Sequence, residues 1–107
     1  MTRVLIAVAL TSLLFAGAAS AQQLNVTIKD HKFQPAEIKV PAKKRVTLTV
    51  VNDDATPEEF ESKKLKVEKV IPGKSKAVVR FGPLEPGRYE FVGEFHEDTA
   101  KGVVIAE

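Results

Sequence analysis

The sequence predicts an all-β fold, a Greek-key antiparallel β-sandwich of about seven strands. Apolar and polar residues alternate with period 2 in several short segments, as they do in half-buried strands. Turn-forming residues separate these segments at intervals of about 8–12 residues, the spacing typical of sandwiches. Beyond residue 21 no segment shows helical periodicity, an internal repeat or a linker, so we expect a single domain.

Three of the extended segments lie in the first half of the chain. Residues 24–29 alternate apolar and polar side chains until Asp30 interrupts the pattern. Residues 36–40 repeat the alternation and end at Pro41, which cannot donate a ladder hydrogen bond. Residues 46–51 are mostly β-branched, as strand interiors often are.

The remaining extended segments are placed by Pro and Gly turn signals. They are residues 65–71 before Pro72-Gly73, 77–81 before Gly82-Pro83, 88–95 after Pro86-Gly87, and a short last strand at 102–106.

The N-terminus resembles a secretory signal peptide. Arg3 supplies the positive charge, residues 4–16 form an apolar run, and Ala19-Ser20-Ala21 is an A-x-A cleavage site. The run is shorter than the roughly 20 residues that span a bilayer, which favours cleavage over a retained anchor. We therefore expect a signal peptide at residues 1–21, a domain at residues 22–107 and, in a bacterium, a periplasmic location.

Composition excludes several functions. The chain contains no cysteine, so disulfides, thiolate catalysis, Cys-based zinc sites and iron–sulfur clusters are ruled out. The formal net charge is only +2 at pH 7, which gives no global attraction to nucleic acid or to an anionic membrane. The sequence therefore favours an exported binding domain that is stabilised by packing, with no nucleic-acid partner.

The most unusual passage is acidic. Pro57 is followed by Glu58 and Glu59, and Glu61 comes after a single apolar residue, Phe60. Carboxylates this close together repel one another unless a cation lies between them. That cation can be a lysine side chain or a metal ion.

A hairpin predicts how these acids are arranged. With a loop at residues 62–65, Glu61 lies opposite Lys66 and Glu59 lies opposite Glu68, so Glu59, Glu61 and Glu68 share one face of the sheet. Phe60 then points to the core. The alternative is a solvated strand face whose acids pair with neighbouring lysines, namely Lys63, Lys64, Lys66 and Lys69.

Three passages, in this order, resemble the cupredoxin family: residues 52–57 (NDDATP), residues 84–91 (LEPGRYEF), and residues 93–96 (GEFH) with 102–105 (GVVI). The resemblance covers almost all of the chain after the signal peptide and implies the cupredoxin sandwich.

The blue-copper ligands of that family are mostly missing. In blue-copper members a histidine follows the proline of the first passage, and the last loop carries Cys-x-x-His and then methionine. Glu58 and Gly93 stand at the first histidine and the cysteine positions, only His96 matches, and the single methionine is Met1. The resemblance therefore implies a cupredoxin-like protein without a type 1 copper site.

A narrower resemblance comes from the acidic pattern. Glu59-Phe60-Glu61 followed by Glu68, with the segment GEFHEDTAKG at residues 93–102, is similar to the periplasmic cupredoxin-like proteins and domains of bacterial iron-permease systems. The resemblance implies binding of copper or iron, and delivery of iron to an inner-membrane iron permease or another periplasmic iron-uptake component. Whether Fe²⁺ is oxidised, and whether the protein forms a homodimer, are left open.

The candidate ligands follow from both arguments. Carboxylate oxygens suit hard ions such as Fe³⁺ or Mn²⁺, and one imidazole extends the choice to Cu²⁺ and Zn²⁺. The primary metal ligands are Glu59, Glu61, Glu68 and His96; the secondary candidates are Glu58, Glu94, Glu97, Asp98 and His31. Glu58 is secondary because the hairpin places it on Phe60's side of the strand.

Two other functions remain as alternatives. One is an electron-transfer cupredoxin with an altered copper site, against which the missing cysteine argues. The other is a non-metal periplasmic interaction module that uses the sandwich as a docking surface.

Overall fold

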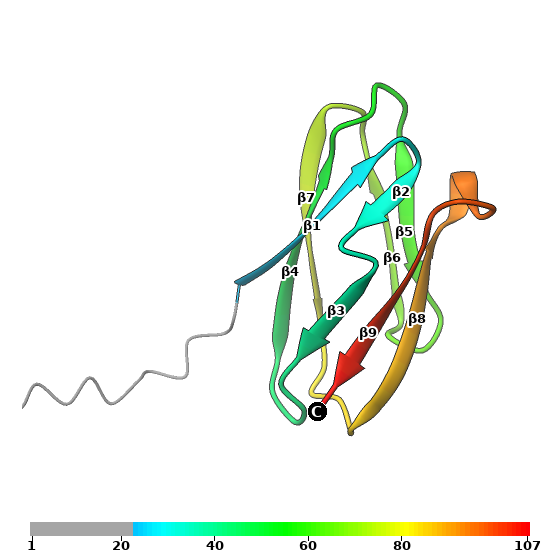
Figure 1. Ribbon diagram of the computed structural model, residues 1–107. Coiled ribbons are helices and arrows are strands. Elements are labelled where there is room, and N and C mark those ends of the chain that lie inside the picture. Colours follow the sequence, from blue (N-terminus) through cyan, green and yellow to red (C-terminus); the bar gives the residue numbers. More distant parts are fainter. Residues whose placement is uncertain (1–22) are drawn as a thin grey trace, which may run out of the picture.

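A computed structural model describes residues 23–107, and the signal peptide predicted at residues 1–21 lies outside the described residues. The described chain forms nine strands and one short 3-10 helix (Figure 1). The elements are β1 Gln23–Lys29, β2 Lys32–Gln34, β3 Glu37–Val40, β4 Val46–Asn52, β5 Glu58–Ser62, β6 Val67–Ile71, β7 Ser75–Phe81, β8 Gly87–Gly93, η1 Glu94–His96 and β9 Lys101–Ala106.

The strands form two sheets that pack face to face. One sheet has the order β2-β1-β4-β7, and the other has the order β3-β9-β8-β5-β6 (Figure 1). The predicted all-β sandwich is confirmed, with nine strands in place of about seven. The extra strands arise because β2 and β3 are separate short strands on either side of Pro35-Ala36, where the chain passes from one sheet to the other, and because the acidic passage is itself the strand β5.

The sequence predicts a purely antiparallel sandwich, but each sheet contains one parallel pair of strands. β1 runs parallel to β4, and β3 runs parallel to β9, so both sheets are mixed. The remaining pairs are antiparallel, including β5 with β6 and β5 with β8. The parallel pair β3–β9 follows from the change of sheet after β2, which brings β3 alongside the C-terminal strand.

An aromatic cluster fills the core beneath β5. Phe60 and Phe91 stack with ring centroids 4.7 Å apart, and Phe33 meets Phe91 edge to face at 4.8 Å. All three side chains are buried. Burial of each ring contributes about 1.5–3 kcal/mol to stability, which fixes the inward face of β5.

The register of the β5–β6 hairpin differs from the predicted one. Ser62 pairs with Val67, so the loop is Lys63–Lys66, and Glu61 lies opposite Glu68. The predicted pairing of Glu59 with Glu68 is wrong. Ser62 remains in the strand because its Oγ donates to the Glu90 carbonyl oxygen and accepts the backbone N–H of Leu65, which closes the loop one residue later than predicted.

The faces of β5 are nevertheless those predicted. The loop shift changes the pairing by two positions, and a two-residue shift preserves which side of the sheet a residue faces. Glu59 and Glu61 lie outside the sandwich with Glu68, and Phe60 lies inside.

The loop before β5 is organised by two polar side chains. Asn52 is buried, its Nδ2 lies 2.9 Å from the Thr56 carbonyl oxygen and 3.1 Å from that of Ile71, and its Oδ1 accepts the N–H of Asp54. The Asp54 carboxylate in turn accepts the backbone N–H groups of Asp30 and His31. These contacts hold the β1–β2 turn against the loop that leads into β5.

Candidate metal site

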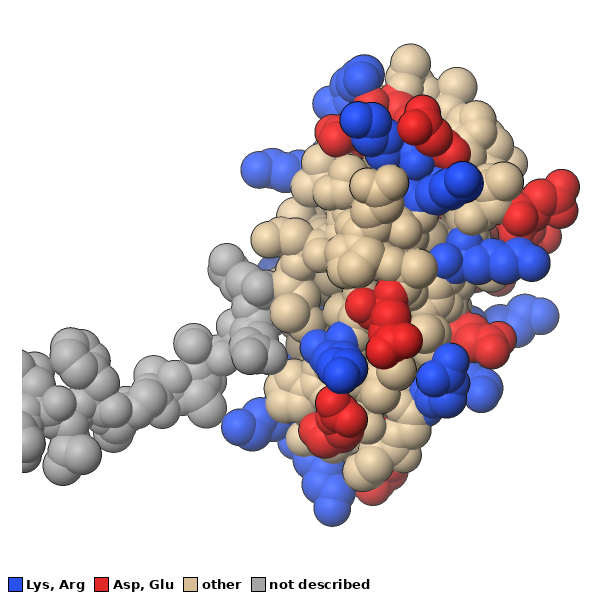
Figure 2. Space-filling view, in the orientation of Figure 1, with Lys and Arg blue, Asp and Glu red and all other residues tan. Residues whose placement is uncertain are grey.

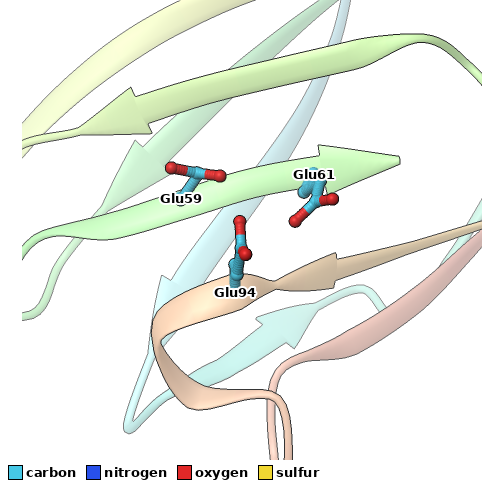
Figure 3. A group of neighbouring side chains, drawn as sticks. All are labelled: Glu59, Glu61 and Glu94. Atoms are coloured by element: carbon cyan, nitrogen blue, oxygen red, sulfur yellow. The ribbon is translucent and has the colours of Figure 1, made fainter. Parts of the chain in front are cut away.

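Three carboxylates meet on the outer face of the second sheet. Glu59 and Glu61 are alternate residues of β5 and therefore point to the same side. β5 pairs with β8 through Phe60 with Gly93 and Glu61 with Val92, which brings the next residue, Glu94, beside them. Oxygen atoms of Glu59, Glu61 and Glu94 all lie within 4.8 Å of one another (Figure 3).

The arrangement is electrostatically demanding. Side-chain hydrogen bonding with Glu94 raises the pKa of Glu61, and hydrogen bonding with Glu59 raises the pKa of Glu94. Such a bond between two carboxyl groups requires a proton on one of them. A cation bound between the three carboxylates would relieve this unfavourable interaction.

Glu59 gives a second, independent observation. Its Oε1 atom is buried and, within residues 23–107, has no hydrogen-bond partner. A buried carboxylate oxygen without a donor is costly, and an ion bound between the three acids would satisfy it. The residues present therefore fit a metal with a preference for oxygen ligands.

Of the predicted ligands, Glu68 lies on the neighbouring strand but is not one of the three acids whose oxygens meet within 4.8 Å. It is exposed on β6 directly across from Glu61, and its charge contributes to the raised pKa of Glu94. The predicted carboxylate face is thus observed, with Glu94 as an additional member that the sequence ranked second. The signal for Glu94 is its place immediately after Gly93, at the end of the strand that pairs with β5.

The alternative of a lysine-neutralised face receives little support. In the described part of the chain the one lysine–carboxylate ion pair is Lys39 with Glu107, and Glu58 is hydrogen-bonded to His96. The charge of Lys63 lowers the pKa of Glu61, but Lys63 and Glu61 form no ion pair within residues 23–107. The lysines of the hairpin therefore leave the outer carboxylates unpaired within residues 23–107.

His96 does not lie with Glu59 and Glu61, because it contacts the opposite side of β5. Its Nδ1 is 2.6 Å from Oε2 of Glu58, whose side chain is 1% exposed. Oε1 of Glu58 accepts the backbone N–H groups of Glu59 at 3.0 Å and Phe95 at 2.9 Å. Glu58 was expected on Phe60's side, and it lies there, fully buried and paired with His96.

His31 stacks against a face of the His96 ring. The two imidazoles stack with centroids 3.5 Å apart and an interplanar angle of 11°. The His31 Nε2 lies 3.4 Å from the Thr56 hydroxyl. Two parallel stacked rings aim their nitrogen lone pairs in parallel planes, so this arrangement does not bring both histidines onto one ion.

The two remaining candidates lie in the turn after η1. Glu97 lines an open hollow of about 330 Å³ that also contacts Glu61, Lys63 and Lys64. Asp98 is exposed and belongs to neither the outer carboxylate cluster nor the Glu58–His96 pair among the described residues.

The position that carries cysteine in blue-copper cupredoxins is closed. A Cβ atom added to Gly93 would lie 2.6 Å from Cδ of Glu58 and 2.6 Å from Cβ of Ala100. Glu58 therefore occupies the space that a side chain at position 93 needs, and no cysteine is present elsewhere in the chain.

The face of the molecule that Figure 2 shows carries no large field of one sign. On the face that Figure 2 shows, Lys and Arg side chains are interspersed with Asp and Glu. Within residues 23–107 no helix is both long and apolar enough to cross a membrane.

The chain belongs to the cupredoxin-like domain family, whose sequence profile matches residues 2–106. A curated relative, the uncharacterized protein RP394 of Rickettsia prowazekii (strain Madrid E), is 43% identical over 83 residues, which cover 78% of this chain and 66% of the relative. The chain thus spans slightly less than two thirds of that relative's length.

Solved structures share the fold. The metal-binding domain of the Cu(I)-exporting P-type ATPase CopA of Streptococcus pneumoniae D39, determined with Cu(I), is similar with a TM-score of 0.68 and 20% identity over 80% of this chain and 85% of that one. Auracyanin A, a "blue" copper protein from Chloroflexus aurantiacus, is similar with a TM-score of 0.69 and 14% identity over 80% of this chain and 98% of that one. The predicted cupredoxin-like sandwich is therefore confirmed, and the proteins that share this fold include copper-binding proteins.

Proposed function

We propose that this chain is a periplasmic metal-binding protein of an iron-uptake system, which holds a metal ion at Glu59, Glu61 and Glu94 and passes iron to an inner-membrane permease. The observation that carries the proposal is the meeting of three carboxylates within 4.8 Å around a buried, unpartnered oxygen of Glu59 in the described chain. Glu68 lies across from Glu61 and supplies a fourth carboxylate at the edge.

The donor set favours iron over Cu(I). Three carboxylates are hard oxygen ligands, which prefer Fe³⁺ or Mn²⁺, whereas Cu(I) prefers thiolate or thioether sulfur. The chain has no cysteine, and its single methionine is Met1. Cu²⁺ remains compatible with carboxylate ligands, so it is the second ion to test. The periplasmic location and the permease follow from the signal-like N-terminus and from the resemblance of the acidic pattern.

Calorimetry with Fe³⁺, Mn²⁺ and Cu²⁺ tests the site. The double variant Glu59→Gln/Glu61→Gln removes two ligands and should lose most of the binding. The matched control is Glu37→Gln/Glu90→Gln, which removes the same charge from exposed positions on the same outer face, both opposite Val103. Undiminished binding by the first variant, or equal loss in both, would show that the site is assigned wrongly.

Thermal unfolding gives a second readout. An ion at 100 times its Kd should add about 2.7 kcal/mol to the free energy of unfolding. If Fe³⁺, Mn²⁺ and Cu²⁺ all leave the melting temperature unchanged, the protein is better explained as an interaction module. The exposed Phe95, which lies between Glu94 and His96, is the observation that favours this second function.

A further inference from the structure

One buried carboxylate connects the two elements that carry the outer acids. Glu58 lies on β5 directly before Glu59, and its Oε1 accepts the Glu59 N–H. The same oxygen accepts the N–H of Phe95, the residue directly after Glu94 in η1. Glu58 therefore bonds the backbone next to one candidate ligand and the backbone next to another.

Its second oxygen strengthens the connection. Oε2 lies 2.6 Å from Nδ1 of His96, so all three of these bonds join β5 to itself or to η1. His96 is also held by the stacked ring of His31. The 3-10 helix η1 has only three residues, and none of them is buried in the core. Backbone bonds hold the turn to itself, from Gly93 N–H to the Ala100 carbonyl oxygen and from Ala100 N–H to the His96 carbonyl oxygen, whereas the side chain of Glu58 joins the start of η1 to β5.

Glu94 needs such a support. Its carboxylate lies within 4.8 Å of two others, and the three repel one another when all are ionised. Without an attachment, η1 would relieve the repulsion by moving Glu94 away from β5. Metal affinity depends on holding ligands in place before the ion arrives, and outer-shell contacts supply that order.

We propose that Glu58 is a positioning residue, not a ligand, which sets the geometry of the Glu59–Glu61–Glu94 site by fastening η1 to β5. The inference rests on the proposed function, since it concerns the same site. Removal of an outer-shell contact of this kind typically weakens metal binding by about 10–100-fold.

Mn²⁺ and Fe³⁺ affinities of four proteins test the inference. Glu58→Ala should bind both ions about 10–100-fold more weakly than wild type. Glu58→Gln keeps an oxygen that accepts the two N–H groups, so its affinity for both ions should be close to that of wild type. If Glu58 were itself a charged ligand, Glu58→Gln would instead lose affinity. Val79→Ala, a cavity variant in β7 of the other sheet, controls for loss of stability alone.

A double variant shows whether Glu58 acts through Glu94. In a Glu94→Gln background, Glu58→Ala should cause little further loss of affinity, because the ligand that it positions is already gone. Wild-type affinity in Glu58→Ala, a loss in Glu58→Gln equal to that in Glu58→Ala, or additive losses in the double variant would each overturn the inference and leave the proposed function standing. If the wild-type protein binds neither ion, the proposed function fails and the inference fails with it.

Discussion

Substitution of Gly93 by alanine tests how Glu58 closes the family's cysteine position. The backbone at Gly93 has φ −89° and ψ 103°, which alanine adopts readily, so the change by itself should stabilise by about 0.4–1 kcal/mol through the unfolded chain. The new methyl would lie 2.6 Å from Cδ of Glu58 and 2.6 Å from Cβ of Ala100, well inside ordinary contact, which begins at about 3.5 Å. Overpacking of this kind costs about 1–3 kcal/mol. We expect a net loss centred on about 1.3 kcal/mol, within a range of about 0–2.6 kcal/mol.

A double-mutant cycle assigns that loss to Glu58. In a Glu58→Ala background the methyl of Gly93→Ala enters space that the carboxylate has left, so the second substitution should cost at least about 1 kcal/mol less than it does alone. Urea unfolding at constant m-value measures the four proteins. Ala100→Gly relieves only the other close contact and serves as the matched background. Costs that add to within about 0.5 kcal/mol would refute the idea that Glu58 fills the position.

Three further predictions concern stability. The raised pKa values of Glu61 and Glu94 mean that the folded state binds these protons more tightly than the unfolded chain, so metal-free stability should fall as the pH rises from the ordinary value of 4.5 through the raised values. In the presence of chelator, the melting temperature of Glu94→Gln should fall less with rising pH than that of wild type. An equal fall in both proteins would contradict this pH dependence. Phe60→Ala should cost about 3–5 kcal/mol in chemical unfolding, because the ring is fully buried against Phe91; a cost below about 1 kcal/mol would contradict the packing. Asp54→Ala removes two backbone hydrogen bonds at a partly exposed site and should cost about 0.5–1 kcal/mol at neutral pH. Backbone hydrogen bonding to His31 lowers the Asp54 pKa, so this advantage of the wild type is present above the ordinary value of 3.8 and is lost as the pH falls through the lowered pKa; a gap that persists at lower pH would contradict it.

The alternation of residues in β5 was enough to predict which acids share a face. Side chains of a strand alternate with period 2, so Phe60 in the core places Glu59 and Glu61 outside whatever the loop does. The register was not predictable in the same way. Loops at residues 62–65 and 63–66 give the same faces, and the choice between them depends on the Ser62 hydroxyl reaching Glu90, 28 residues away.

The contacts of Glu58 could not be predicted from the sequence, because they also depend on residues far along the chain. Glu58 ranked below its neighbours because the hairpin places it on Phe60's side of the strand, away from Glu59 and Glu61. The structure supplies partners from 37 and 38 residues further on, the N–H of Phe95 and the His96 ring. Such partners depend on the β5–β8 pairing, and a two-residue ladder contact leaves no periodic pattern to read.

Stability with and without metal separates a binding site from a solvated acidic face. If the outer carboxylates merely faced water beside lysines, replacing Glu94 by glutamine would remove favourable pairing, and the variant would be less stable under all conditions. If they form a metal site, the same substitution relieves repulsion in the metal-free protein and removes a ligand in the metal-bound protein. Glu94→Gln should then melt at a higher temperature than wild type in chelator and at a lower temperature in saturating Fe³⁺ or Mn²⁺. A change of the same sign in both conditions would contradict the site, because only an ion between the carboxylates reverses the sign of their interaction.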